Sequence, residues 1–316
     1  TFLGNKYWFT GLLATVTVCL SVTAKKMAAK NCLVKNLEAV ETLGSTSVIC
    51  SDKTGTLTQN KMTVCHLWCD SKIAHADSTT SQDEAKEYNG SEGSNLIFPL
   101  YGGSIKVYLS GFKVLMRCAT LCNRAEFIHG EEDKPVLLRQ VRGDASEEAI
   151  LKFVELTKVE SSPSIFRHNN PKLLEIPFSS TTKYQISIHG LENGRCLMVM
   201  KGAPERILAR CTKIFLNNKT KELSDELRHI CDKACTELAE KGERVLGFCD
   251  LLLDEKYHKD YKFCAEPPNF PRRELRFVGF MSLIDPPRPQ VPDAVQRCKS
   301  AGIRVVMVTG DHPVRK

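Results

Sequence analysis

The stretch ICSDKTGTLTQNKMT at residues 49–63 places a carboxylate, a cation and a glycine turn at the end of a short apolar run. Asp52 follows the apolar residues directly, and Lys53 and Gly55 come just after it. A carboxylate can attack a phosphoryl group and form an aspartyl phosphate. Lys53 and the backbone amides of residues 54–56 could neutralise charge on the transferred oxygens. An ordinary turn explains the same residues, and local composition alone favours that interpretation.

Two short apolar runs could position this carboxylate. SVIC at 47–50 leads into Asp52, and IRVVMVTGD at 303–311 ends at Asp311. If the two runs are neighbours in one parallel sheet, their terminal carboxylates converge at the carboxyl ends of the strands, where such sheets carry phosphate chemistry. Like charges repel unless a cation compensates them, and Mg²⁺ would do so.

The region from 276 onwards predicts a strand, a helix and a second strand. RFVGFMSLIDPP starts a strand at 276, PDAVQRCKSAG has the pattern of an amphipathic helix over 292–302, and the apolar run at 303–311 follows. This order within about 35 residues is typical of a βαβ unit in a buried parallel sheet.

Between 112 and 275, helical and strand-like patterns alternate, which predicts an inserted α+β domain. We expect helices over 112–125, 145–158 and 225–241, and strands over 184–190, 196–202 and 244–253. Ahead of this insert, 33–43 has helical spacing with Gly44 as a natural stop. The segment 64–110 is polar, with an exposed loop expected over 78–95.

Composition agrees with a folded protein. The chain has 316 residues, enough for about two domains, with 42% hydrophobic and 26% charged residues. Its formal net charge is +7. The basic residues are scattered and lack the aromatic and arginine interleaving of a nucleic-acid binder, so we expect no nucleic-acid partner.

Fourteen cysteines raise the question of disulfides or zinc. Three pairs lie four residues apart, namely Cys65 with Cys69, Cys118 with Cys122, and Cys231 with Cys235. The gaps between the pairs are long and dissimilar, unlike a zinc module. We therefore expect small buried hydrophobic side chains in a reducing compartment.

The apolar stretch at 7–24 is followed by KKMAAK. It is short for a membrane span and contains Ser and Thr, so it predicts either part of a span or a buried amphipathic helix. Lys25, Lys26 and Lys30 would lie on the cytoplasmic side if it is a span. Both ends of the chain are expected to be cut.

Four motifs follow one another in the order DKTGTLT (52–58), KGAPE (201–205), DPPR (285–288) and TGD (309–311). In this order they resemble the motifs of P-type ATPases. The flanking sequences are most similar to the catalytic α subunits of the Na⁺/K⁺-exchanging branch, with the H⁺/K⁺ branch almost as similar. The resemblance covers essentially the whole chain.

This resemblance implies an α/β fold: an incomplete haloacid-dehalogenase-like, Rossmann-type phosphorylation domain, interrupted by an inserted α+β nucleotide-binding domain and preceded by part of a transmembrane helix. The expected boundaries are 1–24 for the end of the membrane helix, 25–65 for the stalk and first part of the phosphorylation domain, 66–275 for the nucleotide-binding domain, and 276–316 for the truncated second part of the phosphorylation domain.

The resemblance also assigns roles to the first motif. Asp52 becomes phosphorylated by ATP, Lys53 stabilises the phosphoryl group, and Asp52 and the backbone oxygen of Thr54 bind Mg²⁺. Related phosphatases carry a second Asp two residues after the nucleophile as acid and base. Thr54 cannot do that work at neutral pH, so the phosphoenzyme is expected to persist.

The remaining roles concern ATP. The resemblance places Phe178 against adenine and the cations Lys183 and Lys201 near the nucleotide. Other expected ATP-pocket residues are Glu147, Gln185, Gly202 and Arg244. Expected phosphate-side residues are Asp285, Arg288, Thr309, Gly310 and Asp311.

The sequence also departs from the family. Phe9-Thr10-Gly11 stands where the family has Pro-Glu-Gly, and Thr10 cannot supply the charge of that glutamate. The actuator domain, most membrane helices and the GDGVND segment are missing. The fragment itself is therefore expected only to bind ATP, through its insert, and not to transport ions.

For the full-length protein from which this fragment comes, we expect an ATP-driven cation pump of the plasma membrane, with residues 25–316 in the cytoplasm. It would move Na⁺ and K⁺, or H⁺ and K⁺, together with a β subunit. The alternatives are a non-catalytic nucleotide-binding or regulatory short form and a soluble phosphatase of the haloacid dehalogenase superfamily, against which Thr54 argues.

Overall fold

A computed structural model of the chain describes residues 4–76, 96–98, 110–157 and 162–308. The chain divides into two compact units. The first comprises the described residues of Thr1–Thr58 and Pro287–Thr309, and the second comprises those of Gln59–Pro286. The second unit is therefore wider than the 66–275 insert predicted from the sequence.

The first unit is built around two strands. Its elements are α1 (Gly4–Ala28), α2 (Glu38–Gly44), β1 (Val48–Asp52), a tight turn over Lys53–Leu57, α8 (Val291–Ser300) and β14 (Arg304–Val308). Strands β1 and β14 pair in parallel, from Val48 opposite Arg304 to Asp52 opposite Val308. This confirms the predicted pairing of the two apolar runs, and α2 ends at Gly44 as expected.

In the part of the chain that the structure describes, no helix combines the length and the hydropathy that crossing a membrane needs.

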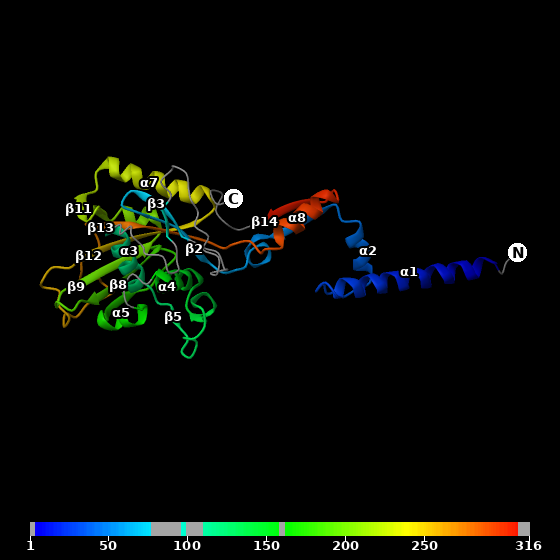
Figure 1. Cartoon of the computed structure of the whole chain (residues 1–316), viewed down its shortest axis with the longest axis horizontal. Helices are drawn as coiled ribbons and strands as arrows, with labels where there is room; N and C mark the ends of the chain where they lie inside the picture. Colours follow the sequence, from blue (N-terminus) through cyan, green and yellow to red (C-terminus); the bar gives the residue numbers. More distant parts are fainter. Residues whose placement is uncertain (1–3, 77–95, 99–109, 158–161, 309–316) are drawn as a thin grey trace. The chain divides into compact units, whose positions relative to one another are not determined.

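The second unit is built around a ten-stranded sheet (Figure 1). The strand order is β4-β3-β2-β13-β12-β9-β8-β7, and β10, with β11 beside it, also pairs with β13. The strands are β2 (Thr63–Cys69), β3 (Lys72–Ala76), β4 (Leu96–Phe98), β7 (Lys172–Ile176), β8 (Tyr184–Gly190), β9 (Cys196–Gly202), β10 (Cys211–Leu216), β11 (Lys219–Glu222), β12 (Arg244–Leu252) and β13 (Leu275–Ile284).

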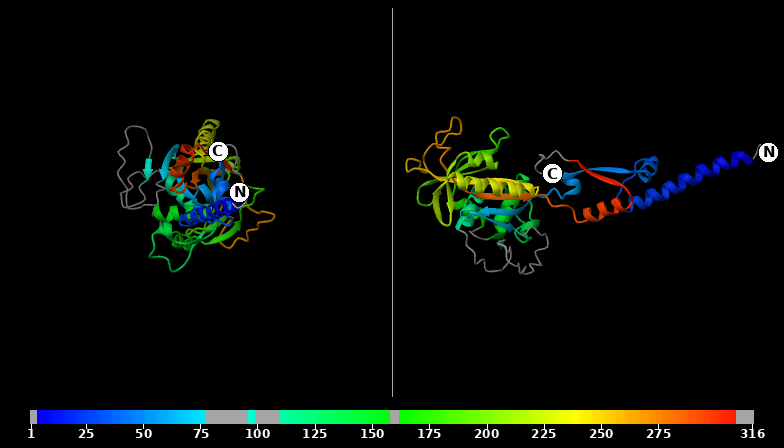
Figure 2. Two further views of the ribbon diagram at one scale, coloured as in Figure 1. Left: turned by 90° about the vertical axis from the view of Figure 1, so that its right-hand side faces the viewer. Right: turned by 90° about the horizontal axis from the view of Figure 1, so that it is seen from above.

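Helices cover both faces of this sheet. They are α3 (Ser110–Leu121), α4 (Ala145–Thr157), α5 (Pro163–Asn169), α6 (Pro204–Leu208) and α7 (Asp225–Glu240), and a two-stranded ribbon of β5 (Glu126–Phe127) and β6 (Val141–Arg142) lies outside the large sheet. Side chains alternate along each strand, so Met198 and Met200 join one core while Leu197 and Val199 join the other. Figures 1 and 2 show α7 on one side of the sheet and α4 on the other.

The predicted βαβ unit at the C-terminal end is wrong. Strand β13 runs antiparallel to β12 and β2 inside the large sheet, whereas β14 pairs with β1. Residues 277–283 are buried on both faces of the sheet. A continuous apolar run is the pattern of any strand covered on both sides, so it does not tell a parallel strand from a central antiparallel one.

The prediction that residues 64–110 form a polar segment is also wrong for the first residues of that segment, which belong to strand β2. Strand β2 is central and mostly buried, and Leu67 and Trp68 each contribute to one of the two cores. The expected loop at 78–95 lies outside the described residues.

Most cysteines of the three pairs spaced four residues apart are buried, as predicted. Five of the six paired cysteines are buried and Cys235 is half-buried. All fourteen lie among the described residues, and none of them forms a disulfide there.

Candidate functional site

The side chain of Asp52 is exposed at the carboxyl end of β1. The chain then turns sharply, because Thr54 is extended and Gly55 has a positive φ of 76°. A positive φ is the conformation that glycine adopts without steric cost. The turn therefore leaves the Asp52 carboxylate exposed at the end of the strand.

Hydrogen bonds fix the shape of this turn. The hydroxyl of Thr58 accepts from the Gly55 amide at 3.1 Å and donates to the Lys53 carbonyl at 3.2 Å. Arg288 donates from Nη2 to the Gly55 carbonyl at 2.8 Å, and its amide donates to the Leu57 carbonyl. The DPPR motif thus reaches the first motif through Arg288.

Asp285, the other charged residue of that motif, belongs to the second unit. Its Oδ1 accepts from the Lys61 amide at 3.1 Å, which ties the end of β13 to the segment before β2. Thr309, Gly310 and Asp311, expected on the phosphate side, lie outside the described residues.

A cavity of about 670 Å³ in the second unit collects most of the predicted ATP residues. Those that line it are Glu147, Phe178, Lys183, Gln185, Lys201 and Arg244. They come from α4, the β7–β8 loop, β8, β9 and β12. The structure therefore brings six residues from separate segments to one place.

Helix α4 positions Glu147. Asp144 caps the helix, since its carboxylate accepts from the Ser146 amide at 2.9 Å. Glu147 lies in the first turn, where a carboxylate interacts favourably with the helix dipole. The Ser146 hydroxyl in turn accepts from Nη1 of Arg244 at 3.0 Å.

Lys201 and Glu147 form a buried ion pair. Lys201 Nζ lies 2.5 Å from Glu147 Oε1, and the two residues are 6% and 8% exposed. A charge at such burial is costly unless it is paired. Lys201 therefore serves the cavity as half of an ion pair and not as an isolated cation.

Phe178 and Lys183 bracket the β7–β8 loop. Phe178 is 59% exposed, so it is not a core residue, although a bulky aromatic at the mouth of a cavity is well suited to stack on a flat ring. Lys183 has a φ of 59°, and its amide donates to the Ser179 carbonyl at 2.8 Å. The loop is thus closed on itself.

Gly202 lies against the backbone of Lys183 and does not itself line the cavity. A Cβ atom at this position would come within 2.4 Å of the Lys183 carbonyl oxygen and 2.7 Å of the Tyr184 Cα. Only glycine permits β8 and β9 to approach so closely here.

The polar side chains of β8 share the face of the sheet that carries the cavity. Gln185 donates to Glu175 at 3.1 Å, and further along the strand lie Ser187 and His189. His189 is 1% exposed, with Nδ1 2.9 Å from the Asn170 carbonyl. Burial lowers the pKa of His189 from 6.5 to about 4, so the ring is neutral at physiological pH.

The residues that line this cavity lie within a region that matches a known protein family. The family model described as "P-type ATPase, cytoplasmic domain N" matches residues 111–290. The chain belongs to the P-type ATPase family. It is 56% identical over 308 residues to the sodium/potassium-transporting ATPase subunit alpha of Drosophila melanogaster and 56% identical over 307 residues to that of Tetronarce californica. It is 53% identical over 308 residues to the human subunit alpha-3.

Each of these alignments covers 96% of the chain but only 28% of the relative. This P-type ATPase chain therefore spans little more than a quarter of the length of the curated relatives it matches.

Sequence reasoning missed part of the lining of the cavity. The additional residues are Arg124, Asp144, Ser146, Pro177, Ser180, Ala203, Pro204, Glu205, Val245 and Leu246. Several are direct neighbours of predicted residues, so extending each motif by one or two positions would have found them. Arg124 is different, because no predicted residue is next to it in the sequence. Its Nε atom lies 3.2 Å from Oε1 of Glu175, and only the fold creates this ion pair.

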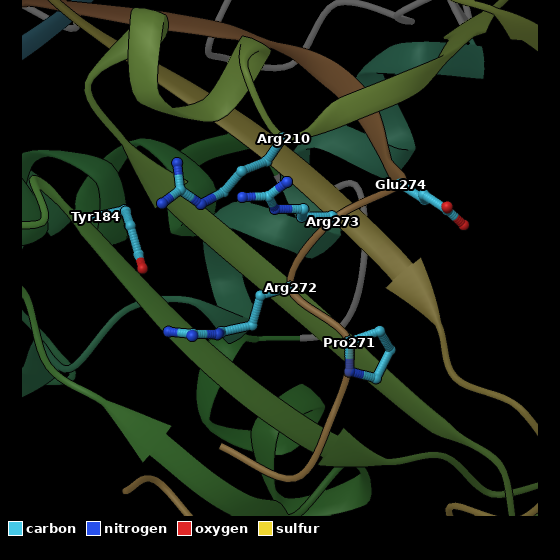
Figure 3. Close-up of a pocket in the computed structure, with 6 residues that line it drawn as sticks. All are labelled: Tyr184, Arg210, Pro271, Arg272, Arg273 and Glu274. Carbon is cyan, nitrogen blue, oxygen red and sulfur yellow. The ribbon is translucent and has the colours of Figure 1, made fainter. Parts of the chain in front are cut away.

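A second cavity of about 530 Å³ lies behind β8, since Tyr184 and Gln185 point to opposite faces of the sheet. Figure 3 shows Tyr184 with Arg210, Arg272 and Arg273, while Glu274 points away from them. The Arg210 guanidinium lies 4.4 Å from the centre of the Tyr184 ring. None of the predicted ATP residues that the structure describes lines this cavity.

Proposed function

We propose that this chain carries the ATP-binding and phosphoryl-accepting parts of an ATP-driven cation pump. The single observation that carries the proposal is the cavity that gathers Phe178, Lys183, Lys201 and Arg244 within the region matched by the P-type ATPase N domain.

The charges of the lining suggest how ATP would lie. Four cations line the cavity (Arg124, Lys183, Lys201 and Arg244), against three carboxylates (Asp144, Glu147 and Glu205). This near balance suits the neutral nucleoside better than the triphosphate, which carries several negative charges. We therefore place adenine against Phe178 and the ribose deeper in the cavity, with the phosphates directed towards its opening.

At Asp52 the proposed reaction is phosphoryl transfer. A carboxylate oxygen of Asp52 forms a bond to the γ-phosphorus as the bond to the bridging oxygen breaks, and ADP leaves. Lys53 would offset negative charge on the phosphoryl oxygens. Mg²⁺ would supply further charge compensation, and the donors for it are hard oxygens, the Asp52 carboxylate and the Thr54 carbonyl. Thr54 offers no carboxylate to activate water, so the aspartyl phosphate would accumulate.

For the whole protein we propose transport of Na⁺ and K⁺, or of H⁺ and K⁺, with a β subunit, at the plasma membrane. Residues 25–316 would be cytoplasmic, and residues 1–24 would be the end of a transmembrane helix. The parallel pair of β1 and β14 would belong to a haloacid-dehalogenase-like phosphorylation domain, and the large sheet to the inserted nucleotide-binding domain.

Phe178→Ala tests the nucleotide site. The side chain is mostly exposed, so its removal should leave the fold unchanged. Loss of one stacked base contact, about 1–3 kcal/mol, should weaken ATP binding by about 5- to 150-fold. Isothermal titration of the 316-residue chain measures this, with Lys219→Ala on exposed β11 as the control. Equal ATP affinity in Phe178→Ala and the parent chain would contradict the site.

Asp52→Asn tests the acceptor. With ATP and Mg²⁺ the parent chain should form an acid-stable, hydroxylamine-sensitive phosphoprotein, and the variant should not. ATP binding without any labelled protein would support the second candidate, a nucleotide-binding module without turnover. The observation that favours this candidate is that the whole lining of the cavity lies in the second unit.

A further inference from the structure

Strands β2 and β3 hold a cluster of soft and borderline metal ligands that the proposed function does not use. Cys65, His66 and His75 each offer one ligand atom, and these atoms all lie within 4.8 Å of one another. His66 and His75 are cross-strand partners, with ring centroids 4.8 Å apart and ring planes at 85°.

An irregularity in β2 makes the cluster possible. Neighbouring residues on a regular strand point to opposite faces of the sheet, so Cys65 and His66 would ordinarily diverge. Here His66 lies opposite Ser282 and Val64 lies opposite Leu283, which leaves Cys65 as an extra residue between them. Such a bulge re-aims side chains, and this one brings the thiol to the histidine pair.

Glu243 orients the cluster. Its carboxylate accepts from Nδ1 of His66 at 2.8 Å and from the Ser282 hydroxyl. Glu243 is 3% exposed, so the carboxylate is held firmly. A buried carboxylate that accepts from one ring nitrogen of a histidine is the usual companion of a metal ligand, because it leaves the other nitrogen's lone pair for the metal.

We propose that Cys65, His66 and His75 form a binding site for Zn²⁺. Thiolate sulfur and imidazole nitrogen are the ligands that zinc prefers, and three protein ligands leave a fourth position for water. Because Nδ1 of His66 is bonded to Glu243, Nε2 is the nitrogen left for the metal. Binding replaces the proton of the Cys65 thiol, which goes to solvent, so Zn²⁺ offsets two negative charges, the thiolate and Glu243.

The geometry requires only small movements. Ligand atoms of a tetrahedral zinc ion lie about 3.5 Å apart. The ligand atoms of the cluster lie within 4.8 Å of one another, so they have to approach by about 1 Å on binding.

Titration of the reduced, metal-free 316-residue chain with Co²⁺ tests the site, since a thiolate bound to Co²⁺ gives a charge-transfer band in the near ultraviolet. We expect one equivalent of Co²⁺ to saturate the band, and one equivalent of Zn²⁺ to abolish it. Cys65→Ser should remove the band, and His75→Ala should weaken Co²⁺ binding at least about tenfold. This readout does not depend on ATP binding.

The matched controls are Cys264→Ser and His258→Ala, both exposed and outside the cluster. They should bind Co²⁺ as the parent chain does. His75 is also exposed, so an unchanged melting temperature in metal-free buffer should show that His75→Ala is folded. The site is refuted if the parent chain shows no saturable band, or if Cys65→Ser and His75→Ala bind Co²⁺ as tightly as the controls.

Discussion

The Asp52 turn and the cavity of the second unit are built in opposite ways. The turn consists of seven consecutive residues, 52–58, with Arg288 added, and its key side chain is exposed. The cavity draws its lining from residues between 124 and 246 and depends on the buried pair of Lys201 and Glu147. One site is therefore local, and the other exists only because the large sheet is folded.

This difference has energetic consequences. The Asp52 turn is stabilised by a few hydrogen bonds near the surface, which contribute about 1 kcal/mol each, or about 2 kcal/mol where the charged Arg288 is the donor. In the cavity, stability and binding rest on the same residues. Changes at the buried ion pair should therefore alter the fold and ATP binding together, whereas loss of the exposed Phe178 side chain should affect binding alone and changes at the turn should have small effects on both.

Lys201→Met should have the largest effect. It leaves the Glu147 carboxylate buried without its partner, which costs about 3–5 kcal/mol. Urea unfolding should show this loss, and ATP binding should fall below detection at concentrations that saturate the parent chain.

The double variant Lys201→Met with Glu147→Gln separates the two causes. Without an unpaired charge it should recover much of the stability, but not ATP binding. If the single variant unfolds at the same urea concentration as the parent chain, the ion pair is not the support of the cavity that we infer.

His189 should make the second unit sensitive to acid. Its folded pKa of about 4 lies below the unfolded value of 6.5, so the unfolded state binds the extra proton first. Stability is therefore complete above pH 6.5 and is lost as the pH falls towards 4. Between pH 7.5 and pH 5 the loss should be about 2 kcal/mol.

The measurement is the difference in unfolding free energy between the parent chain and His189→Gln at several pH values. The variant lacks the titrating ring, so its stability should change less over this range. Parallel pH profiles for the two proteins would show that the buried histidine is not responsible.

Gly202→Ala should have an intermediate effect. The new methyl group collides with the Lys183 carbonyl, and overpacking of this kind costs about 1–3 kcal/mol. Because the collision displaces Lys183, ATP affinity should fall as well. Gly44→Ala is the control, since nothing lies within 4 Å of its added Cβ. Identical ATP affinities in the two variants would show that β8 and β9 can separate without disturbing the cavity.

Gly55→Ala should have the smallest effect. The left-handed conformation costs a residue other than glycine about 1–2 kcal/mol. ATP affinity should stay unchanged, because no residue of this turn lines the cavity. Calorimetric titration with ATP checks this, and a tenfold loss of affinity would mean that the two sites are coupled.

Much of the local structure could be predicted from the sequence. The helices α3, α4 and α7 and the strands β8, β9 and β12 lie where periodicity placed them. The errors are at β2, which was expected to be part of a polar segment, and at β13, which was expected to have a parallel partner. Period and hydrophobicity report burial of a segment but carry no record of which strand lies beside it.

The sequence by itself determined the family, through four motifs in order, and the Asp52 turn, because those residues are consecutive and interact with one another. Only the tertiary structure decided that Lys201 is paired with Glu147 and that the six predicted ATP residues share one cavity. It also decided that a bulge brings Cys65 beside two histidines. The physical reason is the same in each case: side chains far apart in the sequence meet only through strand register and sheet order, and neither can be read from the chain one segment at a time.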